Sequence, residues 1–232
     1  MKIYDLIIIA VLLLFAIKGF KDGFFKTIVS FVGFIIIVVL AYNLKDIVGN
    51  FLVLNFPFFQ FKAFFGGAVV LNIILYQGIA FVLMFLILEI IYRIILTITG
   101  ILEKILKFTV VLGIPSKLLG LLFGFLEGYI MVYLILFFLS QPFFTINIKE
   151  NSYLTNNILE KTPILSSYGE KGLEVFYELK ELADIEDTNE LNLKMSDVIL
   201  KERVISVNNF TKLIEKKKID INDIDEILKK YK

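Results

Sequence analysis

The sequence contains no cysteine and no histidine among its 232 residues. It therefore has no disulfide, no thiol nucleophile, no imidazole base and no usual set of zinc ligands. Walker-type G-x-x-x-x-G-K-[S/T] and dinucleotide-binding G-x-G-x-x-G strings are also missing, and no apolar segment carries two aspartates or a serine with a base. These absences predict a protein that is not an enzyme and that holds neither a cofactor nor a metal ion.

An excess of charge of one sign is absent too, because 24 basic residues face 23 acidic ones. Such a chain lacks the basic face that displaces counterions from phosphates, so we expect no nucleic-acid partner. Apolar residues are abundant instead: 58% of the chain is hydrophobic, with 24 Phe and a mean hydropathy of +0.81. Ordinary soluble domains are roughly 45–50% apolar. The composition therefore predicts that the lipid bilayer surrounds much of the chain.

The distribution of charge divides the chain near residue 148. Residues 1–148 hold 10 basic and 6 acidic residues, whereas residues 149–232 hold 14 and 17. We predict a transmembrane domain over 1–148 and a polar tail over 149–232. Apolar residues recur at helical spacing within 172–183 and 224–231, so the tail should form several short helices.

Four segments have the composition of membrane spans, which need roughly 17–25 mostly apolar residues. Three contain the uncharged runs 27–44, 63–88 and 128–148, and the first reaches spanning length only if Lys18 extends its ammonium to the interface. The expected spans are 3–20, 25–44, 66–90 and 118–142. Three spans remain the alternative.

The segment 101–112 has a different pattern, because its charged residues gather on one side of a helix and its apolar residues fill the other. This pattern is typical of an amphipathic helix that lies in the membrane interface. The following Gly113 and Pro115 should interrupt the helix before the last span. The predicted fold is therefore all-α: an integral membrane bundle of about four transmembrane helices, an interfacial helix and a charged, partly helical tail.

Basic residues predict the orientation of the spans. Seven lie in the connections after the first and third spans, while the opposite side offers only Lys2, Lys45 and Lys62 before the tail. The positive-inside rule places the seven in the cytoplasm, so both termini should be extracytoplasmic.

A glycine pattern, G-F-x-[D/E]-G-aromatic, occurs twice, at residues 19–24 and 124–129. The second copy extends backward, so that one helix face carries Gly120, Gly124 and Gly128 at four-residue spacing. Glycines in such a row let another helix approach backbone to backbone in lipid. We favour packing within one subunit over contact between subunits, and expect Gly19 and Gly23 of the first copy to serve packing as well.

Glu127 is the strongest functional candidate among the polar residues, since ionisable groups at membrane depth often mark ion or proton paths. The alternative that we favour places Glu127 near the headgroups, paired with Lys117 or Lys18. Asp5 either pairs with Lys2 at the surface, the favoured interpretation, or meets a polar group between helices.

Other polar residues have ordinary structural interpretations. Glu89 and Arg93 have the four-residue spacing of a helical ion pair at an interface. Asn72 and Gln77 are candidates for hydrogen bonds between helices.

These motifs together resemble the CvpA family, the colicin V production proteins of bacterial inner membranes. Residues 116–128 are similar to the family pattern [D/N]-R-x-L-G-x-x-[F/L]-G-x-x-R-G, and residues 18–24 to its R-G-[F/W] stretch after the first span. Lys117 replaces the usual Arg, and Glu127 replaces the usual basic residue. The resemblance covers about residues 1–145, with a further similar stretch at 152–163.

The resemblance implies a multi-pass inner-membrane protein linked to toxin or peptide export and envelope homeostasis. We expect a non-enzymatic accessory protein or scaffold whose tail binds a protein partner. The alternative is a small transporter or channel of oligomerised subunits, in which Glu127, Asp5, Asn72 and Gln77 line the path.

Overall fold

The computed structural model describes residues 3–59, 68–98, 101–140, 152–162, 175, 178–179 and 181–231; for 101–112 and 183 it describes the backbone alone. The described residues contain helices and no strand, which confirms the predicted all-α class. In chain order the elements are α1 Ile3–Asn55, α2 Leu71–Ile98, α3 Ile101–Leu139, α4 Tyr153–Lys161, the 3₁₀ helix η1 Leu182–Asp184, α6 Thr188–Lys201, α7 Val207–Glu215 and α8 Ile224–Tyr231.

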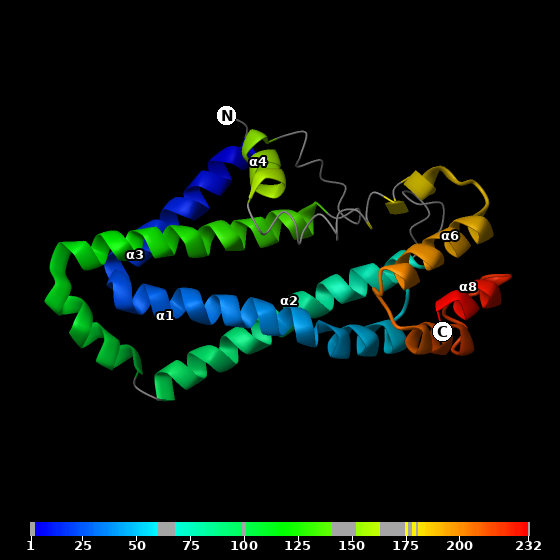
Figure 1. The fold of residues 1–232 in the computed structure, drawn as a ribbon, viewed down its shortest axis with the longest axis horizontal. Helices are drawn as coiled ribbons and strands as arrows, with labels where there is room; N and C mark the ends of the chain where they lie inside the picture. Colours follow the sequence, from blue (N-terminus) through cyan, green and yellow to red (C-terminus); the bar gives the residue numbers. More distant parts are fainter. Residues whose placement is uncertain are drawn as a thin grey trace. The chain divides into compact units, whose positions relative to one another are not determined.

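Three of these helices are long and apolar enough to cross a membrane: α1, α2 and the Gly113–Leu139 part of α3. The expected spans 3–20 and 25–44 both lie in α1, which is interrupted at Gly23 (φ 74°, ψ 173°). Figure 1 shows the change of direction between the two parts of α1. Because Gly lacks a Cβ, it adopts this backbone conformation without the steric penalty of other residues. The break at Gly23 therefore takes the place of the short connection that we expected between these two spans.

The long helices continue beyond the apolar runs that predicted them. α1 reaches Asn55 instead of residue 44, and α2 runs from Leu71 to Ile98 instead of ending at 90. A charged residue ends an apolar run without ending a helix, because ion pairs such as Glu89–Arg93 are compatible with helical geometry. Residues 66–67 and 141–142 of the expected spans lie outside the described residues.

The expected interruption before the last span lies at Gly113, whose φ of 55° and ψ of −132° are not helical. Pro115 follows in the first turn after this break, where its missing N–H would have no helical partner in any case. Figure 1 shows α3 bending here. Residues 101–112 are helical, but their predicted amphipathic face depends on side chains outside the description.

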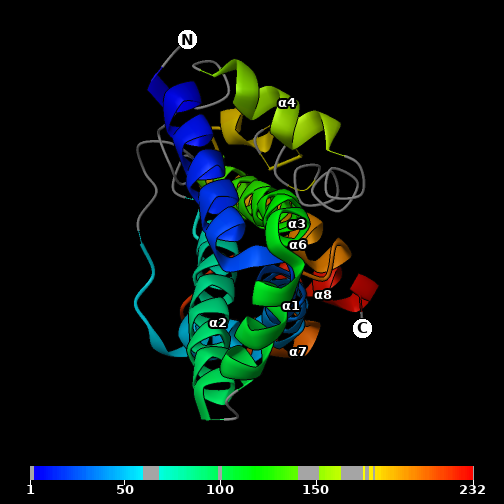
Figure 2. The same cartoon turned by 90° about the vertical axis from the view of Figure 1, so that its left-hand side faces the viewer.

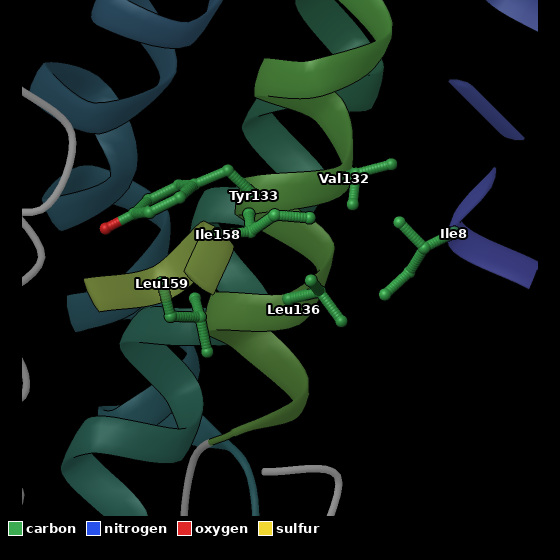
Figure 3. Close-up of a cluster of buried hydrophobic side chains, with 6 residues drawn as sticks. All are labelled: Ile8, Val132, Tyr133, Leu136, Ile158 and Leu159. Carbon is green, nitrogen blue, oxygen red and sulfur yellow. The ribbon is translucent and has the colours of Figure 1, made fainter. Parts of the chain in front are cut away.

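The chain forms two compact units: residues 1–42 with 85–167, and residues 43–84 with 168–232. In the first unit, α4 lies beside the beginning of α1 (Figures 1 and 2). A buried apolar cluster joins α1, α3 and α4 there (Figure 3), and its members are Ile8, Val132, Tyr133, Leu136, Ile158 and Leu159. The segment after the last long helix is therefore part of the membrane-helix unit.

The helices α6, α7 and α8 of the second unit bury apolar residues of their own. Leu191, Met195, Phe210 and Leu213 are 0% exposed, and Leu228 of α8 is buried beside them. The predicted helix at 224–231 is α8, whereas most of the one at 172–183 lies outside the described residues. The charged tail thus contains an ordered helical part.

A polar contact ties α8 to α6. Lys230 Nζ and Tyr231 Oη donate hydrogen bonds to Asp197, at 2.9 and 2.7 Å to Oδ1. Burial raises the pKa of the Asp197 carboxyl, but these hydrogen bonds and the nearby Lys charges outweigh it and hold the pKa below its usual range. The ionised carboxylate therefore stabilises the contact between α6 and α8.

Candidate functional site: a glycine crossing beside a buried carboxylate

The first part of α1 crosses α3 at glycines on both helices. A Cβ on Gly19 would come closer than 3.0 Å to the backbone of Gly120, and a Cβ on Gly120 would come as close to Gly19 and Gly23. A Cβ on Gly124 would lie 2.5 Å from the carbonyl oxygen of Phe15. Backbones this close gain dispersion contacts and weak hydrogen bonds that larger side chains would prevent. The predicted glycine row of α3 thus packs against α1 of the same chain.

Two hydroxyl groups hold the break in α1 at Gly23. Ser116 Oγ accepts a hydrogen bond from the Phe24 N–H at 3.0 Å, and Thr27 Oγ1 donates to the Gly23 carbonyl at 2.8 Å. Both hydroxyl side chains belong to residues less than 5% exposed. A helix break leaves backbone groups without helical partners, and in lipid no water is present to satisfy them. Ser116 and Thr27 supply those partners.

Glu127 projects from α3 beside this crossing and is 7% exposed. Its Oε1 lies 3.7 Å from Lys18 Nζ and accepts a hydrogen bond from Ser30 Oγ at 3.2 Å. Lys117, the other expected partner, instead places its Nζ 5.8 Å from the centre of the Phe20 ring. The carboxylate therefore has both a counter-charge and a hydrogen-bond donor from α1.

A small recess of about 10 Å³, roughly the room that one water molecule needs, opens between these groups. Sites for organic ligands usually enclose roughly 300–1,000 Å³, so this one suits water or a small ion. Its walls offer two carboxylates, one ammonium and two hydroxyls, and are formed by Phe15, Lys18, Gly19, Asp22, Thr27, Ser30, Gly124 and Glu127. In the described parts of the chain, no three acidic side chains gather in a way that could hold a metal ion.

Asp5 lies at the start of α1 and is only 5% exposed. Its Oδ1 accepts hydrogen bonds from Ser152 Oγ at 2.6 Å and from the Leu154 N–H at 3.2 Å. The favoured surface interpretation was therefore wrong for Asp5. The N-terminus of α4 offers N–H groups without partners inside the helix and the positive end of the helix dipole, and both favour a carboxylate at this place.

The remaining sequence candidates make local contacts of their own. Arg93 Nη2 is 2.7 Å from Glu89 Oε1, and the Arg93 side chain is 73% exposed. Asn72 bonds the backbone N–H and C=O of Phe59 and not a neighbouring helix. Gln77 lies against Gly49, and its buried Oε1 accepts no hydrogen bond from any residue that the structure describes.

Sequence reasoning missed the hydroxyl groups of the crossing. Gly19, Gly23 and Thr27 follow one another at four-residue spacing, so the small-residue row of α1 continues into Thr27. That spacing was a usable signal. It also missed Tyr92, whose ring lies against Gly33 and whose Oη donates to the Val29 carbonyl at 2.8 Å. No local pattern indicates that second contact.

Long apolar helices, a backbone crossing at glycines and carboxylates paired inside the helix bundle define a multi-pass helical membrane protein. The family model described as "Colicin V production protein" matches residues 4–163, which is more than half of the chain. The chain belongs to the colicin V production protein family, as the motifs around Gly19 and Gly124 indicated. Comparisons with curated proteins and with solved structures find no significant match.

Replacing Gly124 with Ala should destabilise the helix crossing. The new methyl group would meet the Phe15 carbonyl at 2.5 Å and the Gly19 Cα at 3.0 Å, and these are backbone atoms that cannot move alone. We expect a loss of about 1–3 kcal/mol from overpacking, offset in part by about 1 kcal/mol of improved helix propensity. Thermal unfolding in lipid nanodiscs, followed by circular dichroism, should show a lower midpoint.

Gly49→Ala, on α1, is the matched control. Its methyl group would meet the amide end of the Gln77 side chain, which can move away by rotation about its χ angles, whereas backbone atoms cannot. The Gly49→Ala midpoint should therefore exceed that of Gly124→Ala. Equal midpoints for Gly124→Ala and the parent protein would contradict the crossing.

Proposed function

We propose that this chain is a non-enzymatic accessory protein in the production or export of a colicin V-like peptide toxin, and that it contributes to envelope homeostasis. Membership of the colicin V production protein family supports a role in this process. The observation that carries the scaffold assignment is the ordered, charged helical part of the tail, which follows membrane helices whose polar groups are mostly paired with each other. Such a protein positions partners and does not transform a substrate.

Four membrane crossings are the proposed topology, with α1 supplying two of them. A helix of 53 residues is about 80 Å long, whereas the hydrocarbon core is only about 30 Å thick. The hydrogen bonds from Ser152 and Leu154 to Asp5 support an even number of crossings, because both ends of the membrane domain must then lie on one side. Three crossings would separate these groups by the bilayer.

The proposed location is the bacterial inner membrane, with both termini outside the cytoplasm. The motivating observation is the group of basic residues around the Gly23 break, which includes Lys18, Lys21 and Lys26. Positively charged connections remain preferentially in the cytoplasm.

Cysteine labelling tests this topology, because the chain has no native cysteine. A membrane-impermeant maleimide is added to cells whose outer membrane is permeabilised and whose inner membrane is intact. It should label Ile3→Cys, Asn55→Cys and Lys229→Cys. Lys21→Cys should react only after the inner membrane is opened. Labelling of Ile3→Cys and Lys229→Cys from opposite sides would contradict an even number of crossings.

The tail is the proposed site of protein recruitment. Glu226 and Lys229 are exposed on α8, while Ile224 and Leu228 of the same helix are buried. An exposed helix face with mixed charges can bind a complementary protein surface without exposing the apolar core of the tail.

Site-specific photo-crosslinking tests the recruitment. A benzophenone amino acid at Glu226 or Lys229 should yield a discrete protein adduct in toxin-producing cells. The same probe at Leu14, which is 66% exposed on an apolar face of α1, is the control and should react mainly with lipid. A chain that supports toxin export but gives no protein adduct from either tail position would count against the scaffold proposal.

A second candidate function is ion or proton transport by an oligomer of this chain. It is motivated by the small recess in which Glu127 meets Lys18 and Ser30. Carboxylates at membrane depth are the groups that carry protons in many membrane proteins. This candidate requires a path that continues beyond the recess, which further subunits would have to supply.

Flux measurements separate the two candidates. Liposomes containing the Glu127→Gln variant should conduct protons or Na⁺ at least about tenfold more slowly than the parent if Glu127 is the carrier. Asp46→Asn is the control, because the exposed Asp46 side chain pairs with Lys45 and does not line the recess. Equal flux in the Glu127→Gln variant and the parent, or no flux in either, would remove the transport candidate.

A further inference from the structure

Two lysines far along the chain donate hydrogen bonds to the end of α1, and the first, Lys216, places its Nζ 3.4 Å from the Leu54 carbonyl oxygen. Lys218 Nζ donates to the carbonyl oxygens of Val53 at 2.7 Å and of Phe56 at 2.8 Å. The same ammonium lies 5.1 Å from the centre of the Phe58 ring. The last carbonyls of a helix have no partner inside the helix and carry the negative end of its dipole, so a cation there is favourable.

The beginning of α2 is bonded by the same part of the tail. Asn192 Oδ1 in α6 accepts hydrogen bonds from the N–H groups of Val69 at 2.9 Å and Val70 at 3.4 Å. Its amide group donates to the Thr188 carbonyl at 2.8 Å, which fixes the orientation of the side chain. Asn192 is 4% exposed, so water does not replace these bonds. Asn192, more than one hundred positions away in the chain, thus accepts the hydrogen bonds that a neighbouring N-cap residue would normally accept at the start of α2.

Apolar burial surrounds both polar contacts. Val53 at the end of α1 and Val70 and Leu71 at the start of α2 are 0% exposed. Burial lowers the pKa of Lys218, and the nearby charge of Lys216 lowers it further. Even a partly buried ammonium loses hydration, which is costly unless the group is hydrogen-bonded, and the two carbonyls of the α1 end supply these hydrogen bonds.

We propose that residues 188–221 form a clasp that fixes the end of α1 and the start of α2, with Lys218 and Asn192 as the positioning residues at the two helix ends. The tail is then more than an appended recruitment module. It sets how one membrane helix passes into the next, and opening the clasp would expose buried backbone groups and valine and leucine side chains. The clasp also places the tail on the same side of the membrane as the connection between α1 and α2.

A buried reporter cysteine tests the clasp in the full chain. Val53→Cys preserves the carbonyl that Lys218 binds, and its thiol should react slowly with a maleimide reagent because position 53 is buried. Adding Lys218→Met keeps the length of the side chain but removes its donors. Labelling should then become about tenfold faster, since local opening exposes the thiol.

Three further variants make the outcome specific. Lys212→Met changes an exposed lysine in the same domain and should label at the parent rate, whereas Lys218→Arg keeps donors and charge and should remain close to the parent. Asn192→Ala should accelerate labelling from the other helix end, and it tests the clasp even if the Lys218→Met chain does not fold. Unchanged labelling in the Asn192→Ala variant, or equal acceleration in Lys212→Met and Lys218→Met, would overturn the proposal.

Discussion

Backbone contact at the glycine crossing is the constraint on which the membrane-helix unit depends. Gly19 of α1 and Gly120 of α3 leave no room for a Cβ on either helix, so the two backbones touch. Lipid provides no hydrophobic drive for helices to associate, and close packing must supply the attraction. The crossing also brings Lys18 and Ser30 within reach of Glu127, so the burial of that carboxylate follows from the same contact.

Several polar side chains add hydrogen bonds to the packing of the glycines. The four described next bind at a helix break or at a helix end. Ser116 bonds the backbone at the Gly23 break, and Asp5 bonds the start of α4. In the second unit, Lys218 and Asn192 bond the end of α1 and the start of α2. Unpaired backbone groups are costly wherever water is excluded. Most of the buried polar side chains discussed above therefore have a structural reason before they need a functional one.

The sequence predicted the features that are local in the chain. Apolar runs predicted long helices, the Gly113 and Pro115 pair predicted an interruption before the last of them, and the glycine rows indicated close helix contact. The ends of α1 and α2 were predicted too early. The prediction used the polarity that limits a membrane span, whereas a helix continues for as long as its backbone hydrogen bonds do.

Contacts between distant residues were not predictable from one sequence. Asp5 and Ser152 are 147 positions apart, and Lys218 and Val53 are 165 apart. Neither pair belongs to a periodic pattern, and the acidity of Asp5 is equally compatible with a solvated position beside Lys2. Glu127 had two basic candidates, Lys18 and Lys117, and only the direction in which α1 crosses α3 selects Lys18.

A disulfide between α1 and α3 tests the crossing most directly. The Phe15 Cβ lies 2.6 Å from where a Cβ on Gly128 would be, so Phe15→Cys and Gly128→Cys face each other and reach the Cβ–Cβ distance of a disulfide, roughly 3.5–4.5 Å, once the helices separate by about 1 Å. Oxidation should give an intramolecular disulfide in a chain that still migrates as a monomer without reductant. A disulfide-linked dimer, or two thiols that stay reduced in the folded protein, would contradict a glycine crossing within one subunit.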